Sequence, residues 1–227
     1  MNRIFSLDNP VMAFMGKVAD LIILNLLAIL CSIPVFTIGA SWTALYYVTL
    51  KMVKKEESYI VRDFFKSFKQ NFKQATLIWL LVLFVCGVFG GDFMIYRAMP
   101  NQIPKAIMVI VIVIAFIVFG TILYIFPLLS RFDNTIKNTI RNAFLVATAN
   151  VPYTLLFIVL FALPFVLIFV SPRVYPILFM VGISGPAYLA SIFWRRIFAK
   201  LEPEPEKITE DMDFSIQTEE DKTEENS

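Results

Sequence analysis

The stretch that decides the fold is residues 106–130, AIMVIVIVIAFIVFGTILYIFPLLS, which carries no charged side chain over 25 consecutive positions. A bilayer core about 30 Å thick is crossed by roughly 20 apolar residues in a helix. Within lipid, the backbone polar groups of such a run must pair inside the chain, and without barrel-type alternation they do so as an α-helix. Residues 106–130 therefore predict a transmembrane helix.

The same pattern recurs along the chain. Residues 75–91 and 151–170 are also uncharged, residues 175–194 carry no charge before Arg195, and residues 21–50 form a thirty-residue run without a charge. The chain is 58% hydrophobic and contains 23 Phe among 227 residues. A soluble domain of this length cannot bury so much apolar surface. The composition therefore indicates an all-α, polytopic membrane protein.

The number of crossings depends on residues 21–50. One helix over this run would be roughly 45 Å long, too long for a span without strong tilt. Pro34 and Gly39 favour a turn between a helix over residues 10–32 and a shorter one over residues 40–55. A short crossing is favoured for residues 40–53, and a re-entrant segment stays open. We expect about six membrane segments, or five if residues 21–50 cross once; the remaining helices are expected over residues 75–93, 104–130, 151–170 and 175–198.

Two loops combine basic and aromatic side chains at helical spacing. In residues 59–73, aromatic and basic positions recur every three to four residues, which is typical of an amphipathic helix lying on lipid headgroups. Residues 131–144 repeat the pattern. We predict two cytoplasmic amphipathic helices, and in the first one the candidate interfacial and docking side chains are Phe64, Phe65, Lys66, Phe68, Lys69, Phe72 and Lys73.

The distribution of charged residues indicates how the chain is oriented in the membrane and where the membrane domain ends. Residues 1–201 hold 18 Lys and Arg against 7 Asp and Glu, whereas residues 202–227 hold 2 against 11. Placing the basic loops and both termini in the cytoplasm leaves 17 cationic side chains inside and 3 outside, as the positive-inside rule requires. We expect a membrane domain over residues 1–201 and a disordered acidic cytoplasmic tail over residues 202–227.

Polar groups in the apolar runs are the candidates for a functional site. Asp20 and Asn25 lie in the first helix, and the helix break at Pro34 follows them. Intramembrane polar groups often mark a pathway. The alternative is structural: Asp20 pairs with Lys17 one turn earlier, and Asn25 bonds a neighbouring helix. Asp20, Asn25 and Pro34 are therefore candidates for either a polar pathway or a helix-packing site.

Catalytic patterns are missing from the sequence. The chain has no His and only two Cys, Cys31 and Cys86, both within apolar runs. It shows no nucleophile–base pair, no paired catalytic carboxylates and no phosphate-binding Gly loop. We predict a protein that is not an enzyme and that holds no cofactor or metal. Its basic loops fit lipid headgroups better than nucleic acid.

Several motifs resemble the YesL family of bacterial integral membrane proteins. They are Asn9-Pro10, the segment from Asp20 to Asn25, the segment Cys31-Ser-Ile-Pro-Val-Phe-Thr-Ile-Gly-Ala40, Ala44-Leu-Tyr-Tyr47, the Phe- and Lys-rich residues 64–73, and Pro127-Leu-Leu-x-Arg-Phe-Asp133. The likeness covers about residues 5–200, and Pro-x-x-Thr-Ile-Gly is its most specific element. The resemblance implies a location in the bacterial cytoplasmic membrane, and it assigns no catalytic residue.

The resemblance also implies a process, because genes of this family tend to lie beside carbohydrate ABC importers and glycan-degrading enzymes. Our first hypothesis is an accessory or modulating component of oligosaccharide uptake, whose partners would be the lipid bilayer and the permease subunits of such an importer. The alternative is a small transporter or channel in its own right.

Overall fold

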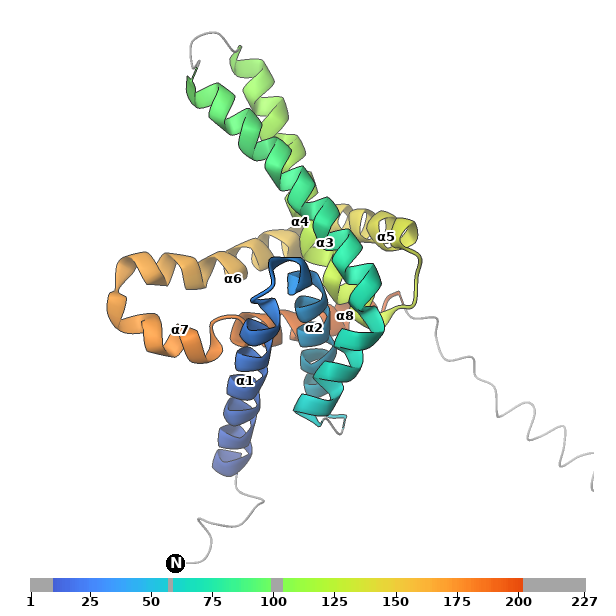
Figure 1. The fold of residues 1–227 in the computed structure, drawn as a ribbon, viewed down its shortest axis with the longest axis vertical. Helices are drawn as coiled ribbons and strands as arrows, with labels where there is room; N and C mark the ends of the chain where they lie inside the picture. The colour runs from blue at the N-terminus through green and yellow to red at the C-terminus, as the bar shows by residue number, and fades with distance from the viewer. Residues whose placement is uncertain (1–9, 57–58, 99–103, 202–227) are drawn as a thin grey trace, which may run out of the picture. The chain divides into compact units, whose positions relative to one another are not determined.

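The computed structural model describes residues 10–56, 59–98 and 104–201. These residues are helical and contain no strand, in agreement with the all-α prediction. The chain divides into two units, residues 1–195 and 196–227. The predicted acidic tail, residues 202–227, lies outside the described residues, as does the Asp8-Asn9 segment before the first helix. The first unit is shown in Figure 1 with its helices labelled.

Helix α2 (Ile38–Lys54) lies at the centre of the first unit. It follows helix α1 (Pro10–Ser32) through the short 3-10 helix η1 (Val35–Thr37), and it packs against α1, α3 and α4. Six of its 17 residues are Gly, Ala, Ser or Thr, and Ala40, Ala44 and Leu45 are completely buried. Small side chains let helix backbones approach closely, which is how helices associate in lipid. The most buried helix is therefore one of the less apolar ones.

Gly39 shows how close this approach is. A Cβ atom at Gly39 would lie 2.6 Å from the carbonyl oxygen of Ala75 and 2.7 Å from Cβ of Trp79, both on α3. Real side chains do not tolerate such distances. Glycine is therefore required at this position by tertiary packing, because the residue itself has an ordinary helical backbone.

Helix α3 (Ile60–Ala98) is continuous over 39 residues, or about 58 Å at 1.5 Å per residue. The expected position of residues 60–73 on lipid headgroups stays a prediction, but these residues are not a helix separate from the one expected over residues 75–93. The reason is that one side of this segment packs on protein, where Asp63, Phe64 and Ser67 are buried. Extensive contact with α2 supports the helix and carries it without a break into the apolar part of α3.

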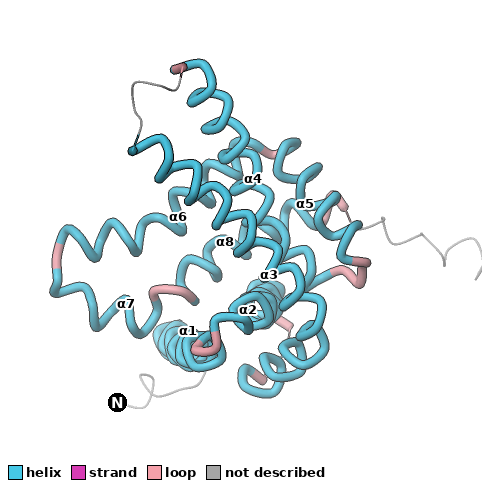
Figure 2. Tube along the Cα trace, turned by 45° about the horizontal axis from the view of Figure 1, so that its top comes forward, coloured by secondary structure: helices cyan, strands magenta, loops and turns pink. Residues whose placement is uncertain are grey.

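Helix α4 (Lys105–Arg131) returns beside α3, and the two form the long pair seen in both views (Figures 1 and 2). Pro127 lies inside α4 without ending it. Helix α5 (Ile136–Ala149) then lies along α4 (Figure 2). The second predicted amphipathic segment is thus a separate helix, whose buried side consists of Thr139, Ala143, Val146 and Ala147.

The last part of the unit contains a broken helix. Helix α6 (Val151–Val170) is followed by the 3-10 helix η2 (Pro172–Val174), α7 (Tyr175–Val181) and α8 (Ser184–Phe198). We expected one helix over residues 175–198, but the helix is interrupted at Gly182 and Ile183 and bends by 56°. A side chain of α1 forms hydrogen bonds with backbone groups at this interruption, as shown below.

Four of the described helices are long and apolar enough to cross a membrane, namely α1 from Val11, α3, α4 from Ala106 and α6. The bent pair formed by residues 172–181 and 184–198 would be a fifth. Helix α2 is not among them because it has only 17 residues. Five of the six expected segments therefore correspond to single helices and the sixth to the bent pair of α7 and α8, whereas a crossing by α2 stays a prediction.

Candidate functional site

Asn25 is the polar residue with the most long-range contacts. It lies on α1 and is completely buried. Its amide nitrogen donates a hydrogen bond to the carbonyl oxygen of Phe179 on α7 over 2.7 Å. Its amide oxygen accepts two hydrogen bonds of 2.9 Å, from the backbone N–H groups of Ile183 and Ser184. One side chain therefore satisfies backbone groups on both sides of the α7–α8 break.

Ser184 completes the arrangement from the other side. Its hydroxyl donates a hydrogen bond of 2.8 Å to the carbonyl oxygen of Leu21, one turn before Asn25. A helix end leaves N–H and C=O groups without intrahelical partners, and in an apolar environment each such group is costly. Asn25 and Ser184 together remove that cost, so the broken helix can stay inside the protein. This cluster does no acid–base chemistry, because amides and hydroxyls do not titrate near neutral pH.

The three candidates Asp20, Asn25 and Pro34 are not brought together. Asp20 is partly exposed, and five residues of helix place it about 140° around α1 from Asn25. It forms no ion pair with Lys17. Pro34 is exposed beyond the end of α1. Of the two interpretations of Asn25, the structure shows hydrogen bonding to neighbouring helices.

Pro34 instead belongs to the turn between α1 and α2. The hydroxyl of Thr37 lies 2.6 Å from the carbonyl oxygens of both Cys31 and Pro34 and so covers the end of α1. The indole nitrogen of Trp79 on α3 donates to the carbonyl oxygen of Val35 over 2.7 Å. Together with the close approach at Gly39, these bonds explain physically why the Pro-x-x-Thr-Ile-Gly segment has the residues it has.

Sequence reasoning missed a second set of buried hydroxyl groups. Thr49 on α2 and Ser191 on α8 are fully buried, and their hydroxyl oxygens lie 2.8 Å apart. Ser41 donates to the carbonyl oxygen of Ala28 on α1 over 2.9 Å. A signal was present, because Ser184 and Ser191 are seven residues apart and so share one face of a helix. These bonds join α1, α2 and α8 across the interior of the unit.

The candidate interfacial residues fall into three groups. Phe64 is completely buried, Phe68 and Phe72 are half-buried, and Phe65 and the three lysines are exposed. The rings of Phe64 and Phe68 stack with centroids 6.2 Å apart. Nearby, the ammonium group of Lys51 at the end of α2 lies 2.8 Å from the carboxylate of Asp63 on α3. The exposed side chains left for lipid or a partner are Phe65, Lys66, Lys69 and Lys73.

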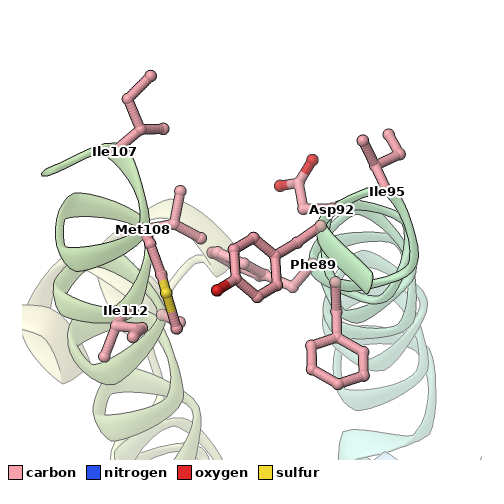
Figure 3. Close-up of a pocket in the computed structure, with 10 residues that line it drawn as sticks. Phe89, Asp92, Ile95, Ile107, Met108 and Ile112 are labelled. Carbon is pink, nitrogen blue, oxygen red and sulfur yellow. The ribbon is translucent and has the colours of Figure 1, made fainter. Parts of the chain in front are cut away.

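Two further hollows have a largely apolar lining. One of about 520 Å³ lies among α2, α3, α4 and α6 and is lined by Trp42, Trp79 and Phe161, among others. Another of about 430 Å³ lies at the far end of the α3–α4 pair, where Phe89 and Asp92 of α3 and Met108 of α4 line it (Figure 3). Among the residues that the structure describes, no group of three or more Cys, Asp and Glu side chains is placed to hold a metal ion.

The fold and these contacts define a helical membrane protein whose buried polar groups serve mainly to join helices. Residues 21–93 match the family described as "Protein of unknown function, DUF624". The chain is also 28% identical over 161 residues to "Uncharacterized protein YesL" of Bacillus subtilis (strain 168), covering 69% of this chain and 75% of that protein. Both matches support the resemblance of the chain to the YesL family. No solved structure matches the chain significantly.

Proposed function

We propose that the protein is a non-catalytic accessory component of a membrane assembly, and that the process it serves is carbohydrate uptake. The observation that carries the proposal is how polar and apolar groups are distributed. Asn25, Ser41, Thr49, Ser184 and Ser191 are occupied by hydrogen bonds between helices. Such groups stabilise a scaffold and do not line a path.

The α3–α4 pair supplies the surface for a partner. In the most apolar 18 residues of α3, and likewise of α4, only 11% of the residues are buried inside the chain. On α3, Gly87, Gly90 and Gly91 are exposed, and a Cβ atom at any of them would meet nothing within 4 Å. Glycines four residues apart allow another helix to approach closely. This face suits a transmembrane helix of another subunit, and the resemblance to YesL-like proteins suggests the permease of an oligosaccharide ABC importer.

Affinity purification of the full chain from its native host tests the proposal, with permease subunits expected in the eluate. Replacing both Gly87 and Gly91 with Leu should release them while leaving yield unchanged. Gly16→Leu is the matched control, because Gly16 is also exposed with nothing within 4 Å of a Cβ atom. A wild-type preparation that contains no transport subunit would contradict the proposal.

A transporter or channel is the second candidate, and Asp20 is the observation that favours it. This carboxylate is partly buried in a membrane helix and has no ion-pair partner among the described residues. If the protein conducts, purified chain in proteoliposomes should pass protons or a sugar, and Asp20→Asn should reduce the flux. Flux that is absent, or unchanged in this variant, rejects the candidate.

A further inference from the structure

A basic and apolar groove lies where α3, α4 and α5 meet. It has a volume of about 450 Å³, within the ~300–1,000 Å³ typical of sites that hold small ligands. Apart from Thr121, its lining on α3 and α4 is aliphatic, for example at Ile78, Ile122 and Ile125. On α5 it includes two cations, Lys137 and Arg141. Among the residues that the structure describes, no acidic side chain lines it. We refer to it as the α3–α5 groove.

The two cations are placed to act together. Lys137 and Arg141 are four residues apart on α5, so they are neighbours on one face of the helix. Both side chains are exposed, and neither is in an ion pair within the described chain. Asp133, four residues before Lys137, lines a different hollow together with Lys73. Within the described part of the chain, an anion at the rim of the α3–α5 groove would therefore meet two cations and no carboxylate.

The level of the groove along α3 is the level at which we expect the edge of a lipid layer. Gln74 on α3 donates a hydrogen bond of 2.6 Å to the carbonyl oxygen of Asn134, just before α5 begins. Gln74 also lies between the last lysine of the basic part of α3, Lys73, and the start of its apolar part at Ala75. Lys137 is one turn beyond Asn134. The charged rim therefore lies where α3 changes from basic to apolar, and the aliphatic lining lies on the apolar side.

We propose that the α3–α5 groove binds an anionic phospholipid, with one acyl chain between α3 and α4 and the phosphate at Lys137 and Arg141. The charges select the headgroup, because basic sites between membrane helices favour anionic lipids. The polar group that α4 contributes to the lining, the hydroxyl of Thr121, already donates to the carbonyl oxygen of Ile117, so the lining on α3 and α4 offers little to a soluble anion. The inference does not depend on whether the protein is a transport accessory.

The test uses the purified full-length protein, stripped of lipid in a neutral detergent. Dioleoyl phosphatidylglycerol or dioleoyl phosphatidylcholine is then added, and native mass spectrometry measures bound lipid. We expect one phosphatidylglycerol to bind in preference to phosphatidylcholine. Each cation near an anionic lipid contributes about fivefold in affinity, so replacing Lys137 and Arg141 with Gln should weaken phosphatidylglycerol binding about 25-fold. Phosphatidylcholine binding should not change.

Two controls make the result decisive. Replacing Lys66 and Lys69 with Gln removes two exposed cations of α3 that do not line the groove, and this should leave the preference intact. Ile117→Trp fills the groove from α4 at a residue that is 36% exposed, and it should lower binding of both lipids. Equal binding of the two lipids by the wild-type protein would overturn the proposal. So would an equal loss in the Lys66 and Lys69 variant, or unchanged binding in Ile117→Trp.

Discussion

Asn25 on α1 and Ser184 at the start of α8 link their two helices by hydrogen bonds in both directions. The amide oxygen of Asn25 accepts the backbone N–H of Ser184 over 2.9 Å, and the Ser184 hydroxyl donates to Leu21 on the helix of Asn25. The two residues are 159 positions apart in the sequence. Helix α1 is therefore fixed to the break between α7 and α8.

Asn25→Ala should destabilise the protein by about 2–3 kcal/mol, because it leaves three backbone groups without hydrogen-bond partners. Interhelical hydrogen bonds in membranes contribute about 0.6 kcal/mol each on average, and the cost of burying the unpaired groups adds to their loss. Thermal unfolding in detergent measures the loss. Ser41→Ala removes a single interhelical bond and should cost clearly less. If the two variants lose equal stability, the Asn25 cluster is not the main link between α1 and the α7–α8 break.

Gly39→Ala should be strongly destabilising, by about 2–3 kcal/mol, because the new methyl group would overlap the backbone of α3 at Ala75. Gly16→Ala adds the same methyl group where nothing lies within 4 Å. It should leave stability unchanged or slightly raised, since Ala favours a helix more than Gly does. The unfolding temperatures of the two variants provide the comparison, and similar values would show that α2 can move away from α3 without cost.

Phe64 and Phe65 are adjacent but should respond differently to truncation. Phe64 is completely buried, whereas Phe65 is 38% exposed. Phe64→Ala should lower stability by about 3–5 kcal/mol, the usual cost for a buried aromatic ring, and should reduce the yield of folded protein. Phe65→Ala should have a smaller effect on both. A larger loss in Phe65→Ala would show that contact with lipid or a partner matters more than packing on α2.

The ion pair between Lys51 and Asp63 joins the end of α2 to the first turn of α3. Lys51→Met should destabilise the protein by about 1.5–3 kcal/mol, because it leaves the carboxylate of Asp63, a residue only 7% exposed, without its cation. Exchanging the two residues, as K51D with D63K, should restore much of the loss. Chemical unfolding of the wild type, the single variant and the exchange variant measures the coupling. An exchange variant no more stable than Lys51→Met would mean that the attraction between the charges contributes little.

The orientation of the helices can be measured with single cysteines. In a background in which Cys31 and Cys86 are replaced by Ala, Asn2→Cys and Ser227→Cys should be labelled by an impermeant maleimide only after the cells are opened. Ser171→Cys, after α6, should be labelled from outside. These outcomes follow from the 17-to-3 distribution of cations if α2 crosses the membrane. Labelling of Asn2→Cys in intact cells would instead show five crossings.

Helices whose limits depend on local chemistry could be predicted from the sequence. The limits of α1 and α6 agree with those expected, because each helix covers an apolar run that ends near Pro, Asn or Ser. The length of α3 could not be predicted in this way. Its basic part resembles a surface helix, and only contact with α2 shows that Phe64 is buried and that the helix is continuous.

The sequence by itself determined that the protein is helical, that several of its helices are long and apolar enough to cross a membrane, and which segments carry the positive charge. Hydrophobicity, Pro and charge act over a few residues, so these properties can be derived along the chain. Only the tertiary structure decided that Asn25 closes the α7–α8 break, that Gly39 must lack a side chain, and that Lys137 and Arg141 border a groove. Each of these depends on atoms from helices that are distant in the sequence, because a hydrogen bond or a close contact is set by distance in space.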